Sequence, residues 1–122
     1  MITNFLLVAL GGAIGAAARY GLGLALLRDG FPLAIIAANV IGSFLMGLFV
    51  VWSFQKGMGH LNPLVMTGIM GGFTTFSAFS LEAYTLFEQG EVGAAGAYVA
   101  ISVIVSLLAV VAGVALARGI WA

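Results

Sequence analysis

The segment "GGFTTFSAFS" (residues 71–80) lies within a long apolar stretch, where a helix facing only lipid would need neither paired glycines nor alternating hydroxyls and phenylalanines. Glycine destabilises a helix by about 1 kcal/mol relative to alanine, and the β-branched Thr74 and Thr75 are stiff. The segment therefore predicts a helix break over Gly71 to Thr74, with a second helix starting around Thr74 or Thr75. Broken backbone at membrane depth is tolerated only where it is buried in protein or lines an aqueous cavity, and its freed carbonyls can coordinate a cation.

The composition of the whole chain is that of an integral membrane protein. Of its 122 residues, 63% are hydrophobic and 7% are charged, whereas an average soluble domain is about 25% charged. The chain has no cysteine, which excludes disulfides and thiolate metal sites, and its zero net charge without a basic run does not favour nucleic acid as a partner. The N-terminal stretch has no positively charged leader region, so we expect it to be retained.

Polar residues divide the chain into four apolar stretches of membrane-spanning length. A spanning helix needs about 20 apolar residues, and the four stretches run over 4–27, 33–54, 62–87 and 93–118. We therefore expect an all-α membrane protein made of one four-helix transmembrane domain. Small residues spaced by four, which let helix backbones approach closely in lipid, predict tight packing at three places: Gly11-xxx-Gly15, Ser43-xxx-Gly47 and Gly68-xxx-Gly72.

The basic residues give no preferred orientation in the membrane. With four spans, Lys56 and Arg118 fall at one end, whereas Arg28 and Arg19 fall at the other. Lysine and arginine residues in short loops set the orientation of a membrane protein, so an equal number of them at the two ends predicts insertion in both directions. Four helices are also few for a permeation path, so we expect a homo-oligomer and favour an antiparallel dimer. The alternative is a single orientation fixed by other factors.

Polar residues inside the first two spans mark either a pathway or a structural joint. Asn39, with Gly42 and Ser43 on its flank at i+3 and i+4, either joins helices or lines a wet path. Arg19 has three interpretations. It snorkels to the interface beside Tyr20, it anchors backbone carbonyls at a helix end, or it forms an electropositive vestibule that gathers anions.

Two further sets of side chains follow helical spacing. Tyr98, Ser102 and Ser106 form one stripe on the fourth span, where serines either bond back to the i−4 carbonyl or serve as a ladder of rotatable donors. On the second half of the third span, one face is expected to carry Phe76, Phe79 and Glu82 and its neighbour Ser77 and Ser80. Phenylalanine rings have positive edges that can contact an anion, although core packing is the common use of such a pair.

Three motifs together resemble the Fluc (CrcB) family of bacterial fluoride channels: "GGAIGAAARYGLG" (11–23), "NVIGSFLMG" (39–47) and, most specifically, "GIMGGFTTFSAFSLE" (68–82). The match in length and four-span layout covers essentially the whole chain. The resemblance implies a multi-pass protein of the bacterial cytoplasmic membrane that exports fluoride passively and gives fluoride resistance. It also implies a dual-topology, antiparallel homodimer with two pores and a broken third helix.

The same resemblance implies roles for individual residues. A structural sodium ion on the dimer axis would be held by the backbone carbonyls of Gly71 and Thr74 from each subunit. The implied anion pathway comprises Asn39, Phe76, Ser77, Phe79, Tyr98, Ser102 and Ser106. Glu82 and Arg19 would gate or position this pathway, and Ala78 departs from the family pattern because a hydroxyl residue is common at its position.

Three other classes of protein fit the residues less well. A small dual-topology multidrug transporter needs a membrane-embedded carboxylate, expected in the first span, and residues 4–27 contain none. A purely structural membrane subunit explains the glycines but not a hydroxyl stripe beside paired phenylalanines. An enzyme is not expected, because the chain has no phosphate-binding loop, no paired catalytic carboxylates and a single histidine, His60, in a loop.

Overall fold

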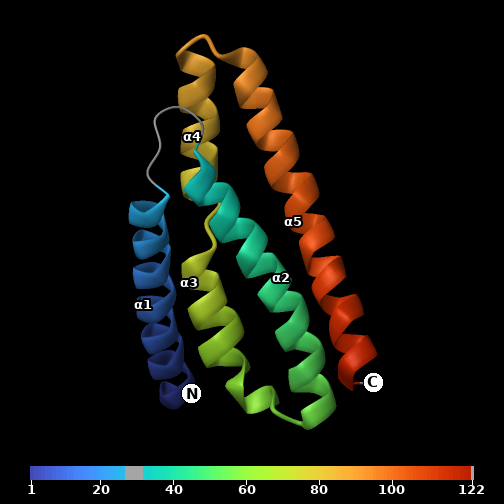
Figure 1. The fold of residues 1–122 in the computed structure, drawn as a ribbon. Coiled ribbons are helices and arrows are strands. Elements are labelled where there is room, and N and C mark those ends of the chain that lie inside the picture. The colour runs from blue at the N-terminus through green and yellow to red at the C-terminus, as the bar shows by residue number, and fades with distance from the viewer. Residues whose placement is uncertain (27–31, 122) are drawn as a thin grey trace.

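A computed structural model describes residues 1–26 and 32–121 and shows an all-helical protein with four helices long and apolar enough to cross a membrane (Figure 1). The elements are α1 (Ile2–Ala25), α2 (Leu33–Lys56), η1 (Gly59–Leu61), η2 (Pro63–Met70), α3 (Gly71–Phe73), α4 (Ser77–Glu88) and α5 (Val92–Trp121). The predicted number of spans is confirmed. The predicted first connector, which includes Arg28 and Asp29, lies largely outside the described residues.

The third span is interrupted within the predicted segment. Gly71 and Gly72 continue the helix as α3, and the backbone becomes extended only at Thr74, where ψ is 157°. The α4 helix then begins at Ser77. The predicted break over residues 71–74 is therefore confirmed, and it falls at the last of these residues. The reason is a long-range contact, because the N–H of Thr75 donates to the side chain of Asn39 on α2 rather than continuing the helix.

The first half of the third span is a π-helix, η2, which the sequence did not predict. It runs over Pro63–Met70, and the N–H of Gly71 that follows it donates to the carbonyl of Met66, five residues earlier. π-Helical turns are rare and are found mostly near functional sites. Here the π-helix ends at Met70, and the short α3 segment separates it from the break.

Glycines bring α1 into backbone contact with η2 and α3. A Cβ atom added at Gly11 would lie 2.9 Å from Cα of Gly68, and one added at Gly72 would lie 2.7 Å from the carbonyl oxygen of Gly12. Real Cβ atoms essentially never approach so closely. The predicted tight packing of the Gly11-xxx-Gly15 and Gly68-xxx-Gly72 motifs is therefore confirmed.

A second glycine contact joins α2 to α5. A Cβ atom at Gly47 would lie 3.0 Å from N of Val114, and one at Gly113 would lie 3.1 Å from N of Leu48. The partner of Gly47 is thus a glycine on another helix. Ser43, the other member of the predicted Ser43-xxx-Gly47 motif, lines a cavity instead.

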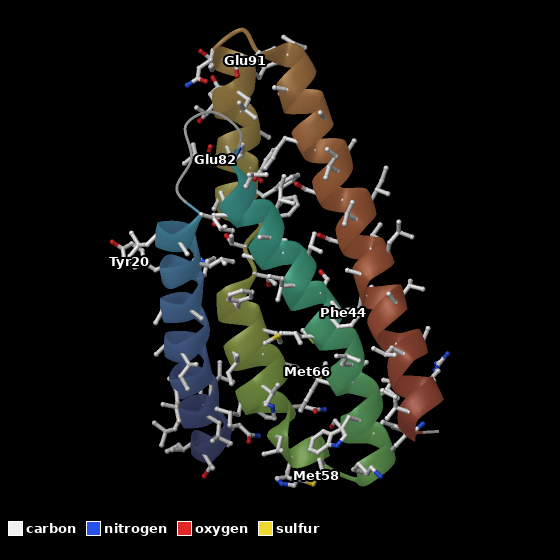
Figure 2. All side chains as sticks on the ribbon, viewed as in Figure 1. Tyr20, Phe44, Met58, Met66, Glu82 and Glu91 are labelled. Carbon is white, nitrogen blue, oxygen red and sulfur yellow. The ribbon has the colours of Figure 1, made fainter. Side chains whose placement is uncertain are left out.

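Apolar side chains cover most of the molecule's outer surface (Figure 2). Large residues along α1 and α5, such as Phe5, Leu10, Ile104 and Leu108, are more than half exposed. The buried core is small and groups Phe79, Leu86, Ala95 and Tyr98 between α4 and α5. Such an inverted distribution suits a multi-pass membrane protein, whose outer surface faces lipid tails rather than water.

Candidate functional site

Asn39 holds the break in the third span. Its Oδ1 accepts a hydrogen bond from the N–H of Thr75 at 2.8 Å, and its Nδ2 donates to the carbonyl of Thr75 at 3.1 Å. Both main-chain groups of Thr75 are therefore satisfied from α2. Since an amide nitrogen carries two hydrogens, Asn39 keeps one donor for a further acceptor. Of its two predicted roles, the joint between helices is confirmed, and Asn39 also lines a cavity.

Two carbonyls at the break lack their usual helical donors. The N–H of Thr75, which would close a turn on the carbonyl of Gly71, goes to Asn39. The N–H of Ala78, which would close a turn on the carbonyl of Thr74, instead donates to Oγ1 of Thr75 at 3.2 Å and caps α4. The carbonyls released in this way belong to Gly71 and Thr74, the residues expected from the family resemblance to hold a cation.

A cavity of about 430 Å³ lies between α2, the break and α5. Its walls combine polar groups with aromatic and aliphatic ones. The polar side chains that line it are Asn39, Ser43, Thr74, Thr75, Ser102 and Ser106, and the two rings are Phe76 and Phe79. Three separate segments of the chain therefore place donors and ring edges around one space within the span.

The serines of α5 face this cavity with their hydroxyls free. Ser102 is 4% exposed, and within the described part of the chain the buried Oγ atoms of Ser102 and Ser106 have no hydrogen-bond partner. By contrast, the hydroxyls of Thr74, Ser80 and Thr85 donate to the carbonyl four residues earlier at 2.8–2.9 Å. Back-bonding is thus used elsewhere but not at these two serines. A buried hydroxyl without a partner costs about 1–3 kcal/mol, and a bound acceptor would remove that cost.

Three aromatic rings form a row beside the cavity. The ring centroids of Phe76 and Phe79 are 5.4 Å apart with planes inclined at 47°, and those of Phe79 and Tyr98 are 5.3 Å apart at 31°. Phe79 is 8% exposed, whereas Phe76 is 76% exposed. Phe79 and Tyr98 therefore belong to the core cluster of one chain, while most of the Phe76 ring is left uncovered.

The remaining predicted residues lie around the cavity rather than in its walls. Tyr98 is fully buried behind Phe79, and Glu82 on α4 lies near enough to interact electrostatically with it. Nε of Arg19 points at the carbonyl of Gly72 across 3.4 Å, which favours the anchoring interpretation of Arg19. Ser77 is exposed, with its Oγ 3.3 Å from that of Thr75.

Comparison with known proteins identifies the family. The family described as CrcB-like protein, Camphor Resistance (CrcB), matches residues 6–114. The chain belongs to this CrcB family. The fluoride-specific ion channel FluC of Roseobacter denitrificans is 56% identical over 123 residues, covering 97% of the chain and 98% of that protein. The proteins of the same name from Ruegeria sp. and Paracoccus denitrificans are 52% and 49% identical, each covering 98% of the chain and 98% of the relative.

Two residues of this CrcB chain were not among the predicted site residues. Ser43 was assigned to helix packing, yet it lines the cavity one turn after Asn39 on the same face of α2. Thr75 was considered for its stiffness and as a possible start of the second helix, yet its hydroxyl also caps α4 and its backbone binds Asn39. The i, i+4 spacing from Asn39 could have identified Ser43, whereas the role of Thr75 depends on contacts between distant segments.

Proposed function

We propose that this chain is a fluoride-specific ion channel through which fluoride crosses the membrane passively. The observation that carries the proposal is membership of the CrcB family, together with relatives of about half identity over nearly the full chain that are named fluoride-specific ion channels. Those relatives are channels rather than enzymes, in agreement with the expectation from sequence. The multidrug-transporter alternative is set aside, because α1 carries no acidic residue.

The cavity offers what a strongly hydrated anion requires. Fluoride sheds water only if N–H, O–H and ring-edge groups replace it, and conduction requires several sites that hold the ion without trapping it. The free N–H of Asn39 and the partnerless hydroxyls of Ser102 and Ser106 can supply such donors. The tilted pair Phe76 and Phe79 adds ring edges, which attract anions without the grip of an ammonium group. We assign the anion pathway to these groups, with Ser77 and Tyr98 beside them.

The proposal includes an antiparallel homodimer. The region of the break exposes Gly71, Ser77, Ser80 and most of the ring of Phe76 on the surface of a membrane span. Polar groups are costly against lipid, so a second copy is the natural cover for this surface. The even distribution of lysine and arginine allows both orientations, which favours an antiparallel arrangement. We place the dimer in the bacterial cytoplasmic membrane.

A structural sodium ion fits the geometry of the break. Hard cations bind oxygen ligands, and unwound backbone carbonyls serve as sodium ligands in other membrane proteins. The carbonyls of Gly71 and Thr74 have lost their usual helical donors, so two from each subunit could hold such an ion. When bound, the ion supplies a fixed positive charge. Arg19 anchors the adjoining turn at the carbonyl of Gly72, and we assign to Glu82, which lies near Tyr98, a role in gating or positioning the pathway.

Flux through liposomes tests the proposed function. The purified protein is reconstituted, and fluoride and chloride efflux are followed with ion-selective electrodes. We expect fluoride efflux well above that of empty vesicles and no measurable chloride efflux. No fluoride efflux, or equal efflux of the two ions, would refute the function. Adding lysines to one loop biases the orientation, so full activity of a biased variant on its own would refute the antiparallel dimer.

A further inference from the structure

A second hollow continues the cavity along α5. A groove of about 310 Å³ lies on the flank of α5 and is lined by Val110, Val111, Val114, Ala115 and Arg118. Val110 also lines the first cavity. The two hollows therefore share Val110 and follow one another along α5 toward its C-terminal end.

The lining residues of α5 form a stripe that winds slowly around the helix. From Ser102 and Ser106 in the first cavity, steps of four residues, each turning the stripe by about 40°, lead to Val110, Val114 and Arg118 in the groove. The chemistry changes along this stripe from hydroxyls, through branched aliphatic side chains, to a guanidinium group. A course with donors in the membrane centre and a cation at its end has the polarity that an anion path requires.

Arg118 has no acidic side chain of the described residues near it. It is exposed in the last turn of α5. The described carboxylates belong to Glu82 and Glu88 on α4 and to Glu91 in the turn after it, and Figure 2 places Glu82 and Glu91 toward the opposite end of the bundle from the C-terminus. A guanidinium is always charged and binds anions through five donors. Its field is focused where low-dielectric walls surround a groove.

We propose that Arg118 gathers anions at the mouth of a permeation path that runs along α5 from the break. This inference rests on the proposed channel function and adds a residue that acts on the rate of ion entry. The other use of an arginine at this depth is to anchor the helix end among lipid headgroups. An anchor would affect insertion and stability, whereas an anion-gathering residue affects flux in a manner that salt can screen.

Charge variants at matched positions test the proposal. Lys56 is the control, because it lies in the last turn of α2, is exposed and lines neither hollow. Fluoride efflux per folded protein is compared for wild type, Arg118→Gln, Arg118→Lys and Lys56→Gln at low and high concentrations of an impermeant salt. We expect Arg118→Gln to lower efflux about threefold at ~10 mM ionic strength and by less than about 1.5-fold at ~1 M, where the Debye length is only ~3 Å.

The controls separate this role from general surface charge and from folding. Arg118→Lys, which keeps the charge, should retain most of the wild-type efflux, and Lys56→Gln should match wild type at both salt concentrations. Equal losses in Arg118→Gln and Lys56→Gln would overturn the proposal, and so would a loss that salt does not change. Wild-type liposomes without fluoride efflux would instead refute the channel function itself.

Discussion

Replacing Gly15 with alanine tests whether α1 and the third span touch through their backbones. A Cβ atom at Gly15 would lie 2.8 Å from N of Phe73 and would also meet the carbonyl oxygen of Ile69. Both obstructing atoms are main-chain atoms of helices, so neither can rotate away. A Cβ atom added at Gly12, also on α1, would meet nothing within 4 Å. Gly12→Ala is therefore a matched control with the same change in composition.

The expected difference can be worked out from two opposing effects. Overpacking a closely packed site costs about 1–3 kcal/mol, and obstruction by backbone atoms places Gly15→Ala at the upper end, about 3 kcal/mol. Alanine also improves helix propensity by up to about 1 kcal/mol at either position. The variant Gly15→Ala should thus lose about 2 kcal/mol, whereas Gly12→Ala should be unchanged or gain up to about 1 kcal/mol.

The free energy of unfolding is measured by titrating the protein from a mild detergent into SDS and following helical circular dichroism. All variants are compared at one protein concentration, because the stability of an oligomer depends on concentration. We expect Gly15→Ala to unfold at a clearly lower SDS fraction than Gly12→Ala. Coincident unfolding of the two variants would refute the backbone contact between α1 and the third span.

Five other substitutions, at four positions, separate structural from conducting roles. Asn39→Leu leaves both main-chain groups of Thr75 without partners and should cost about 2 kcal/mol or more in SDS titration. Asn39→Asp keeps the acceptor and should cost less. Equal losses in the two variants would contradict the pair of hydrogen bonds between Asn39 and Thr75. Ser102→Ala removes a buried hydroxyl that has no partner, so stability should stay level or rise by up to about 1 kcal/mol, while fluoride efflux falls. Unchanged efflux would show that Ser102 has only a packing role. Phe79→Ile should lower both efflux and stability, the latter by about 1–2 kcal/mol, whereas Phe76→Ile should lower efflux in a protein that still dimerises. Normal efflux in both phenylalanine variants would show that the rings only pack.

Much of this fold follows from local sequence. Apolar length determines the four spans, and helical spacing determines the shared faces of Phe76 with Phe79 and of Ser102 with Ser106. The first feature depends on the composition of one continuous stretch, and the second depends on residues about one helical turn apart. The tight packing of the glycine motif in α1 could also be predicted, because close approach of helices in lipid depends on small side chains.

The remaining features depend on contacts between distant segments. Within the predicted segment 71–74, the break lies at Thr74 because Asn39, on another helix, takes the N–H of Thr75. The η2 π-helix has no local signature, and the partner of Gly47 proved to be Gly113 on α5. A single sequence without contact information does not contain these pairings. Site residues could be predicted where helical spacing alone places them on a shared face. Ser43 was missed, although its i, i+4 spacing from Asn39 indicated that it lies on the same face of α2.

The contact between Gly47 and Gly113 bears on how large an ion can pass. This contact lies directly beside Val110 and Met46, two residues that line the cavity. With main chain against main chain, α2 and α5 cannot come closer, and their spacing does not vary with side-chain rotamers. Along the proposed pathway, the separation of α2 and α5 at this level is therefore set by the backbone. Two glycines that do not line the cavity can then contribute to discrimination by size.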